Sequence, residues 1–215
     1  MLTAENIHKS YNGLNVLKGI NLTIERGEVV SIVGASGAGK STLLHILGTL
    51  DAADQGKLMI NGMDIAQLDK ARLSKFRNQQ IGFIFQFHNL FPEFTAVENV
   101  CIPAYIKGDK GAESRAVELL KKLGLESRID HKPSELSGGE QQRVSVARAL
   151  INNPSIVFAD EPSGNLDSQS ADELHQLFFD LRNELDQTFV IVTHNMDLAG
   201  MADRKLEIKD GVIVS

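Results

Sequence analysis

The sequence predicts an α/β fold with a central, mostly parallel sheet, a flanking antiparallel β layer and a helical insertion. Three apolar runs predict the central strands: "EVVSIVG" from Glu28, "SIVFAD" from Ser155 and "FVIVTH" from Phe189. None of them alternates strictly between apolar and polar residues, and loop residues bound each run, as in strands that are buried on both faces of a parallel sheet. We expect residues 1–215 to form a single domain.

The antiparallel layer is predicted by shorter runs at 2–8, 22–24 and 57–60. A closing hairpin is predicted by "RKLEIKDGVIVS". Asp210 and Gly211 stand at its turn, and this dipeptide favours two-residue hairpin turns.

The pattern becomes mainly helical between about residues 87 and 153, which predicts a helical subdomain inserted in the α/β core. Thr95 and Glu98 have the spacing of a capping box at the start of one helix. A second helix is predicted by one apolar stripe: Ala116, Leu119, Leu120 and Leu123. A third helix begins at Ser137 and runs to about Ile151.

Charge and cysteine content restrict the function classes. The formal net charge of -6 provides no basic field for a phosphate backbone, so we expect no nucleic acid as the main partner. Cys101 is the single cysteine; it cannot form an internal disulfide, and its apolar neighbours suggest a buried thiol in a reducing cytoplasm. The segment "MLTAENIHKS" lacks the apolar core of a signal peptide, and no apolar run approaches the ~18 residues that span a bilayer. We therefore expect any membrane subunit to be another chain.

The strongest functional signal is "GASGAGKS", which lies between a predicted buried strand and the helical "STLLHILG". This stretch matches the phosphate-loop pattern, in which glycines let backbone N–H groups face the phosphates of a nucleotide. Lys40 can reach the β- and γ-phosphates, and the Ser41 hydroxyl can bind Mg²⁺. A merely tight turn would not need lysine followed by serine. The predicted nucleotide-binding residues of this stretch are Gly34, Ser36, Gly37, Ala38, Gly39, Lys40, Ser41 and Thr42.

Two adjacent carboxylates close the apolar strand in "IVFADEPSGNLD". Asp160 is placed to bind magnesium, usually through water, and Glu161 projects toward the γ-phosphate, where a general base could orient the attacking water. A general base of this kind contributes ~10² to 10⁴ in rate. The alternative, an acidic helix cap after a strand, is disfavoured by the phosphate loop in the same chain.

Gln86 in "GFIFQF" and His194 in "IVTHN" each follow a hydrophobic run. We expect both at the carboxyl edge of the sheet, where α/β folds bind their ligands. Gln86 is assigned to the metal and the attacking water, and His194 to the γ-phosphate; taken alone, each would be ordinary loop polarity. The predicted catalytic residues are thus Glu161, His194 and Gln86, and the predicted metal ligands are Ser41, Gln86 and Asp160.

A second anion site is predicted at "LSGGEQQRV". Ser137 and Glu140 have the spacing of a capping box, and the two glycines between them allow a close approach to the backbone. The start of a helix attracts anions. In isolation the stretch would be interpreted as a well-capped helix and nothing more.

Together these motifs resemble those of the ATP-binding-cassette (ABC) ATPases, which have an α/β phosphate-loop NTPase core, over all 215 residues. The "LSGGE" signature separates that family from other phosphate-loop ATPases. In the family two cassettes pack head to tail, and the signature of one closes over the ATP that the other holds. The resemblance implies a homodimer in which Ser137, Gly138 and Gly139 contact the γ-phosphate in trans, with Asp167 along the seam. Tyr11 matches the aromatic position that stacks on adenine.

The stretch "FRNQQIGFIFQFHNLFPEFTAVENV" with "DEPSGNLD" resembles most closely the ATPases of lipoprotein-releasing systems, and also those of macrolide or peptide exporters and cell-division complexes. The resemblance implies an ATP-hydrolysing subunit that powers a separate membrane permease from the cytoplasmic side of the inner membrane. Phe91, Phe94 and Val97 would line a groove for the permease, or else pack in the core. Two residues depart from the family: Ser163 stands where threonine is commoner, and Phe91 where a smaller aliphatic residue is usual.

Two other classes are disfavoured. A soluble cassette that acts on nucleic acid usually carries a long coiled-coil insertion or two fused cassettes, and this chain shows neither pattern. An ATP sensor without hydrolysis is disfavoured because Glu161 and His194 are both present.

Overall fold

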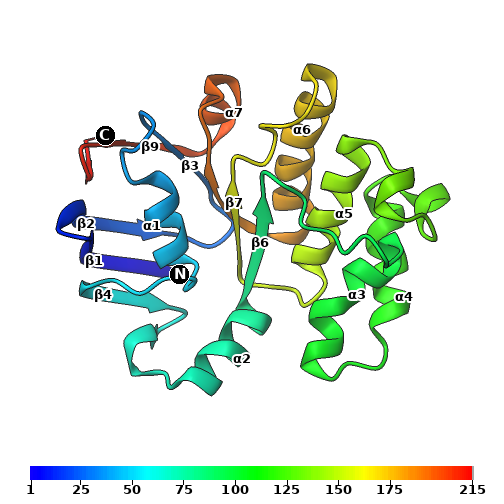
Figure 1. Ribbon diagram of the computed structural model, residues 1–215, viewed down its shortest axis with the longest axis horizontal. Helices are drawn as coiled ribbons and strands as arrows, with labels where there is room; N and C mark the ends of the chain where they lie inside the picture. The colour runs from blue at the N-terminus through cyan, green and yellow to red at the C-terminus, as the bar shows by residue number, and fades with distance from the viewer. Residues whose placement is uncertain (215) are drawn as a thin grey trace. The chain divides into compact units, whose positions relative to one another are not determined.

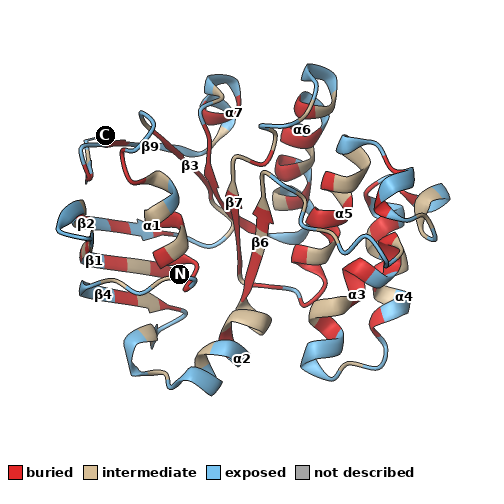
Figure 2. Ribbon diagram, in the orientation of Figure 1, coloured by how far each residue is buried: buried red, intermediate tan, exposed pale blue. Residues whose placement is uncertain are grey.

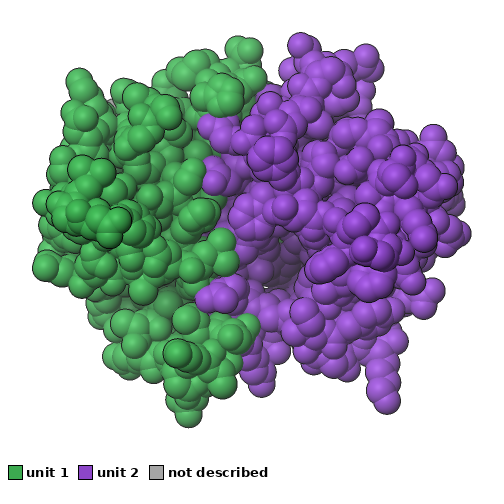
Figure 3. Space-filling view, in the orientation of Figure 1, with its two compact units in different colours: residues 1–74, 181–215 green, residues 75–180 purple. Residues whose placement is uncertain are grey.

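The computed structural model describes residues 1–214. The chain forms two compact units, shown in different colours in Figure 3. The first comprises Met1–Ser74 and Leu181–Ser215, and the second comprises Lys75–Asp180. The predicted helical subdomain over about 87–153 stays a prediction.

The first unit contains an antiparallel sheet with the strand order β2-β1-β4-β5 (Figure 1). Its strands are β1 (Leu2–Tyr11), β2 (Leu14–Ile24), β4 (Gln55–Ile60) and β5 (Met63–Asp64). The antiparallel layer is confirmed, but β2 begins well before the predicted run at 22–24. The periodicity was hidden by a β-bulge at Gly19 (φ +86), where Ile7 pairs with Ile20 and His8 with Lys18.

The same unit contains four strands of mostly parallel sheet, in the order β10-β9-β3-β8. They are β3 (Val29–Val33), β8 (Thr188–Val192), β9 (Arg204–Lys209) and β10 (Val212–Ile213). Every residue of β3 and β8 is buried, which confirms the prediction from their unbroken apolar runs. The hairpin β9-β10 turns at Asp210 (φ +51) and Gly211 (φ +84), as predicted.

Two helices of the first unit follow central strands. The helix α1 (Lys40–Leu47) follows β3 and packs against β8, and α7 (Met196–Met201) follows β8 and packs against β3. A short 3₁₀ turn, η1 (Ile65–Gln67), follows β5. Helices thus follow β3 and β8 where these strands end, which is the arrangement that positions ligands in α/β folds.

The second unit combines two parallel strands with a cluster of helices. The strand β6 (Ile81–Phe85) pairs with β7 (Ile156–Asp160), and the predicted central strand from Ser155 is confirmed. Three helices pack on one another: α3 (Ala96–Lys107), α4 (Ala112–Lys122) and α5 (Gly138–Leu150) (Figure 1). Two 3₁₀ turns, η2 (Glu126–Arg128) and η3 (Pro133–Glu135), connect α4 to α5.

The helices α3 and α5 begin where the sequence predicts. Thr95 caps α3 with the predicted capping box, and Ser137 caps α5 in the same way. On α4, Ala116 and Leu120 are buried, which confirms the centre of the predicted stripe. Figure 2 shows buried residues, in red, along most of β6 and β7 and on parts of α3 and α5.

Two helices were not predicted: α2 (Lys70–Gln80) and α6 (Ser168–Leu185), in which the boundaries between the units fall. Only Phe76 of α2 is buried, so this helix has no apolar stripe that periodicity could detect. In α6 the stripe exists, because Leu174, Phe178 and Leu181 are buried at helical spacing.

Cys101 is 1% exposed, as predicted from its apolar neighbours, and burial raises the pKa of its thiol. Among residues 1–214, none of the helices combines the length and the hydropathy that a membrane span requires.

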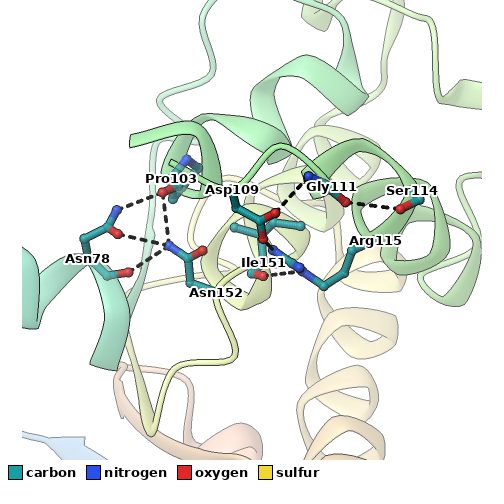
Figure 4. Close-up of polar contacts among 8 residues, drawn as sticks. All are labelled: Asn78, Pro103, Asp109, Gly111, Ser114, Arg115, Ile151 and Asn152. Carbon is teal, nitrogen blue, oxygen red and sulfur yellow. Dashed lines mark hydrogen bonds and ion pairs between the residues drawn. The ribbon is translucent and has the colours of Figure 1, made fainter. Parts of the chain in front are cut away.

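A buried amide network joins helices of the second unit (Figure 4). The Asn152 Nδ2 donates to the carbonyl oxygens of Asn78, at 2.9 Å, and Pro103, at 3.1 Å. The Asn78 Nδ2 also donates to the Pro103 carbonyl, at 2.9 Å. Beside this network, the Arg115 Nε donates to the Ile151 carbonyl at 2.8 Å. The side-chain donors of Asn78, Arg115 and Asn152 thus help to tie the turn after α5 to α2, α3 and α4.

Replacing Asn152 by aspartate should destabilise the fold. The substitution Asn152→Asp removes the N–H donors and places oxygen against two carbonyl groups, which should lower the free energy of unfolding by about 2–4 kcal/mol. Urea denaturation at neutral pH measures this. The matched control is Asn153→Asp, the same change at the exposed neighbour. A variant Asn152→Asp as stable as the parent would refute the role of the network.

Candidate functional site

The phosphate loop connects β3 to α1 and needs its glycines. Gly34, Gly37 and Gly39 have φ values of +149°, +77° and +104°. A Cβ on Gly34 would lie 2.2 Å from the Ile208 carbonyl oxygen, and one on Gly39 would lie 2.9 Å from Leu17. A Cβ on Gly37 would meet nothing within 4 Å, so the loop is open at this position. The loop is thus tightly packed on one side and accessible on the other.

The start of α1 is available to an anion. Its N-cap is Gly39, which has no side chain to bind the N–H groups of the first turn. The Lys40 Nζ bends back over the loop and donates to the carbonyl oxygens of Gly34, at 2.8 Å, and Ala35, at 3.0 Å. Of the remaining predicted loop residues, Ser36 and Ser41 are exposed, Thr42 is half-buried and Ala38 is buried.

Tyr11 lies at the end of β1 and is 44% exposed. Its hydroxyl donates to Asp51 Oδ2 at 2.5 Å, and this hydrogen bond raises the pKa of Tyr11. The Lys9 Nζ lies 5.0 Å from the ring centroid and 2.9 Å from Asp51 Oδ1. Lys9 and Asp51 therefore fix the orientation of the ring. Sequence reasoning missed Asp51 because it is distant in the chain, and Lys9, two residues from Tyr11, because no motif marks it.

His194 follows β8 and is exposed. The residues on both sides of it are fixed: the Asn195 N–H donates to Thr193 Oγ1 at 3.0 Å, and Asn195 Oδ1 caps α7 by accepting from Leu198 N at 2.8 Å. Because Ile32 of β3 pairs in parallel with Val192 of β8, the phosphate loop and His194 leave the same edge of the sheet. This placement within the first unit confirms the predicted one.

In the second unit, Gln86 and Glu161 directly follow the paired ends of two neighbouring strands. Phe85 pairs with Asp160 at the ends of β6 and β7, and the two predicted catalytic residues come next in each segment. Glu161 has φ +46°, a left-handed conformation that few non-glycine residues adopt and that is enriched at functional sites. Gln86 and Asn165 exchange two hydrogen bonds of 3.1 Å, from Gln86 Nε2 to Asn165 Oδ1 and from Asn165 Nδ2 to the Gln86 carbonyl.

The signature helix is capped by its own side chains. The Ser137 Oγ accepts from Glu140 N at 3.2 Å, and Glu140 Oε2 accepts from Ser137 N at 2.7 Å. Arg128 Nε also donates to Glu140 Oε1, at 2.8 Å. Ser137 and Gly138 are exposed. The predicted capping box is therefore confirmed, and its serine and glycine surface faces outward.

The segment after Glu161 lies against this signature. A Cβ on Gly138 would lie 3.6 Å from Leu166 Cδ2, and one on Gly139 would lie 3.1 Å from Ser170 Oγ. Asp167 accepts from the Ser170 backbone N–H at 2.9 Å and from its hydroxyl at 2.8 Å, and these bonds lower the pKa of Asp167. Asp167 thus caps α6 beside the signature glycines.

Comparison with known proteins identifies the family. The family model described as "ABC transporter" matches residues 17–164. The chain belongs to the ABC transporter family. This cassette is 63% identical over 216 residues to the lipoprotein-releasing system ATP-binding protein LolD of Cytophaga hutchinsonii, covering 100% of this chain and 99% of the relative. It is 59% identical to the protein of the same name from Bacteroides fragilis, with 100% of each chain covered.

Solved structures agree with this membership. The cassette is similar to a dimeric ATP-binding cassette in a post-hydrolysis state bound to ADP and Pi, with a TM-score of 0.90 and 42% identity, covering 100% of this chain and 97% of the other. The α/β phosphate-loop fold predicted from the sequence is therefore confirmed.

The pH dependence of the free energy of unfolding should show whether the Glu140 carboxylate of the capping box stabilises the protein. The backbone N–H of Ser137, and then Arg128, lower the pKa of Glu140 in the folded protein. A lowered pKa gives a stabilisation that is present above the unfolded value of about 4.3 and is lost as the pH falls through the folded value. Urea unfolding between pH 7 and 3 should therefore depend less steeply on pH in Glu140→Gln than in the parent.

The matched control for this measurement is Glu118→Gln on the exposed face of α4. The free energy of unfolding of this variant should depend on pH as steeply as that of the parent. If the free energy of unfolding depends on pH equally in Glu140→Gln and in the parent, the Glu140 carboxylate does not contribute to stability.

Proposed function

We propose that this ABC cassette hydrolyses ATP to ADP and phosphate and so powers a separate membrane permease in lipoprotein release. The observation that carries the proposal is the open phosphate loop, with its uncapped helix start, in a chain that is 63% identical to a lipoprotein-releasing system ATP-binding protein. The cassette acts at the cytoplasmic side of the inner membrane, where the permease holds it.

The first unit binds the nucleotide. The N–H groups at the start of α1 and the Lys40 ammonium bind the phosphates, because both are donors at the phosphate loop: the N-cap is a glycine, and Lys40 Nζ lies against the Gly34 carbonyl. The adenine stacks on the Tyr11 ring, whose orientation Lys9 and Asp51 already fix. Ordering this ring before the nucleotide arrives lowers the entropy cost of binding.

Hydrolysis needs a group that orients water. Glu161 does this: it directly follows β7, and its left-handed backbone (φ +46°) departs from strand geometry at this point. Gln86 assists from the neighbouring strand end, and His194 contacts the γ-phosphate from the exposed end of β8. Each of the three side chains follows a strand whose backbone is rigid.

The predicted metal ligands fit Mg²⁺ in their chemistry. The Ser41 hydroxyl, the Gln86 amide oxygen and the Asp160 carboxylate are hard oxygen donors, which Mg²⁺ prefers. When bound, the ion would neutralise charge on the phosphates.

The signature acts in trans in a homodimer. Ser137 Oγ accepts a hydrogen bond within the capping box, so its O–H hydrogen can still donate to the γ-phosphate bound by the other protomer. Exposed Gly138 and half-buried Gly139 let this phosphate approach the backbone. Asp167, beside these glycines, lies along the shared seam.

The loop after Gln86 offers an apolar surface to the permease. Phe87, Phe91 and Phe94 are 69%, 50% and 42% exposed, and the rings of Phe91 and Phe94 lie 5.8 Å apart. Buried Asn99 holds this loop, because its Oδ1 accepts from Phe91 N at 2.8 Å and its Nδ2 donates to the carbonyl of Phe94 at 3.1 Å. Val97 is buried and belongs to the core instead of this surface. Exposed aromatic groups of this kind mark binding surfaces.

The substitution Glu161→Gln should slow turnover strongly without abolishing ATP binding. Loss of the base should lower kcat by about 10² to 10⁴, and the trapped ATP should prolong the life of the dimer. ATPase assays and size-exclusion chromatography with ATP and Mg²⁺ measure both effects.

The control for this variant is Glu118→Gln, which should hydrolyse ATP like the parent. The trapped protein should also recover a permease and lipoprotein from detergent-solubilised membranes of the source cell. Parental ATPase activity in Glu161→Gln would show that Glu161 is not the base.

A further inference from the structure

Gln142 is a fully buried amide whose neighbours are the proposed catalytic segments. It lies on α5, in the turn that follows the signature, and is 0% exposed. Its Nε2 donates to the Phe85 carbonyl at 3.2 Å and to the Pro162 carbonyl at 2.7 Å. Its Oε1 lies 2.5 Å from His88 Nδ1.

The network fixes the direction of each bond. An amide nitrogen has two hydrogens, and both are directed to carbonyl oxygens that can only accept. The Oε1 of Gln142 therefore accepts, and His88 Nδ1 donates. Every polar atom of this buried side chain has a partner, which an apolar residue of the same size could not provide.

The bonded groups are adjacent in sequence to the catalytic residues. Phe85 precedes Gln86, and Pro162 follows Glu161. The same helix holds the next residues of the loop, because Arg148 donates to the carbonyl oxygens of His88, at 2.8 Å, and Asn89, at 2.7 Å. One helix thus positions the backbone at both catalytic segments and at the start of the exposed aromatic loop.

We propose that Gln142 is a positioning residue for ATP hydrolysis, which sets the backbones beside Gln86 and Glu161 and joins them to the loop at His88. This role rests on the proposed ATPase function. The left-handed backbone of Glu161 costs energy and persists only where neighbouring contacts hold it. The Pro162 carbonyl is the next peptide group, and Gln142 binds it with the shortest bond from its Nε2.

The test uses Gln142→Met, which retains the volume of the side chain and removes all three hydrogen bonds. Because the phosphate loop belongs to the first unit, the affinity and KM for ATP should stay within about twofold of the parent. A small displacement of the catalytic groups should lower kcat about tenfold. The matched control is Gln176→Met on the exposed face of α6, which should leave kcat unchanged.

A double-mutant cycle separates positioning from general damage. If Gln142 acts through Glu161, single-turnover hydrolysis by Glu161→Gln should fall less than about twofold further when Gln142→Met is added. A full kcat in folded Gln142→Met would overturn the proposal. So would a second tenfold loss in the Glu161→Gln background.

A second variant keeps the test decisive if Gln142→Met does not fold. His88→Leu changes a half-buried loop residue and removes only the bond to Oε1; kcat should fall about threefold at unchanged KM. An unchanged kcat in this variant would reject the role. A parent protein that does not hydrolyse ATP would instead reject the proposed function, and the positioning role with it.

Discussion

A helix leaves its first backbone N–H groups without intrahelical partners, and the two glycine-rich segments of this chain meet that constraint in opposite ways. At α1 the N-cap is Gly39, which has no side chain to bind these groups, so we propose that they bind the phosphates of ATP. At α5 the capping box binds the N–H groups of Ser137 and Glu140, and not those of Gly138 and Gly139, which lie between them. The first segment is therefore suited to hold the nucleotide, and the second presents a hydroxyl and a glycine surface. This difference explains why one chain carries two apparent anion sites.

The parallel strands impose the second constraint. Strands that are hydrogen-bonded in parallel end at the same edge, so the phosphate loop and His194 emerge together in one unit, as do Gln86 and Glu161 in the other. The backbone at Glu161 then departs from strand geometry at once, with φ +46°. Gln142 is the buried group that contacts the chain beside this turn, which connects the signature helix to the proposed hydrolysis step.

The sequence predicted the elements whose causes are local. Unbroken apolar runs predicted β3, β7 and β8, and capping boxes predicted the starts of α3 and α5. It did not predict α2, which buries a single side chain, nor the bulge at Gly19 that interrupts β2. The partners of the site were also missed: Asp51 meets Tyr11, and Gln142 meets Phe85 and Pro162, only because the chain folds. Local patterns do not encode contacts between residues so distant in the chain.

Mixing two inactive variants tests most directly that the cradle and the signature of one site belong to different chains. Lys40→Ala removes the lysine that we propose to bind the phosphates. Gly138→Asp places a charge on the signature, where a Cβ meets Leu166 only at an ordinary 3.6 Å, so the protein should fold. Random pairing restores one intact site in half of the dimers, so the mixture should regain up to about a quarter of the parental ATPase sites. A mixture that hydrolyses ATP no faster than the sum of the two variants, at every ratio, would contradict the composite site.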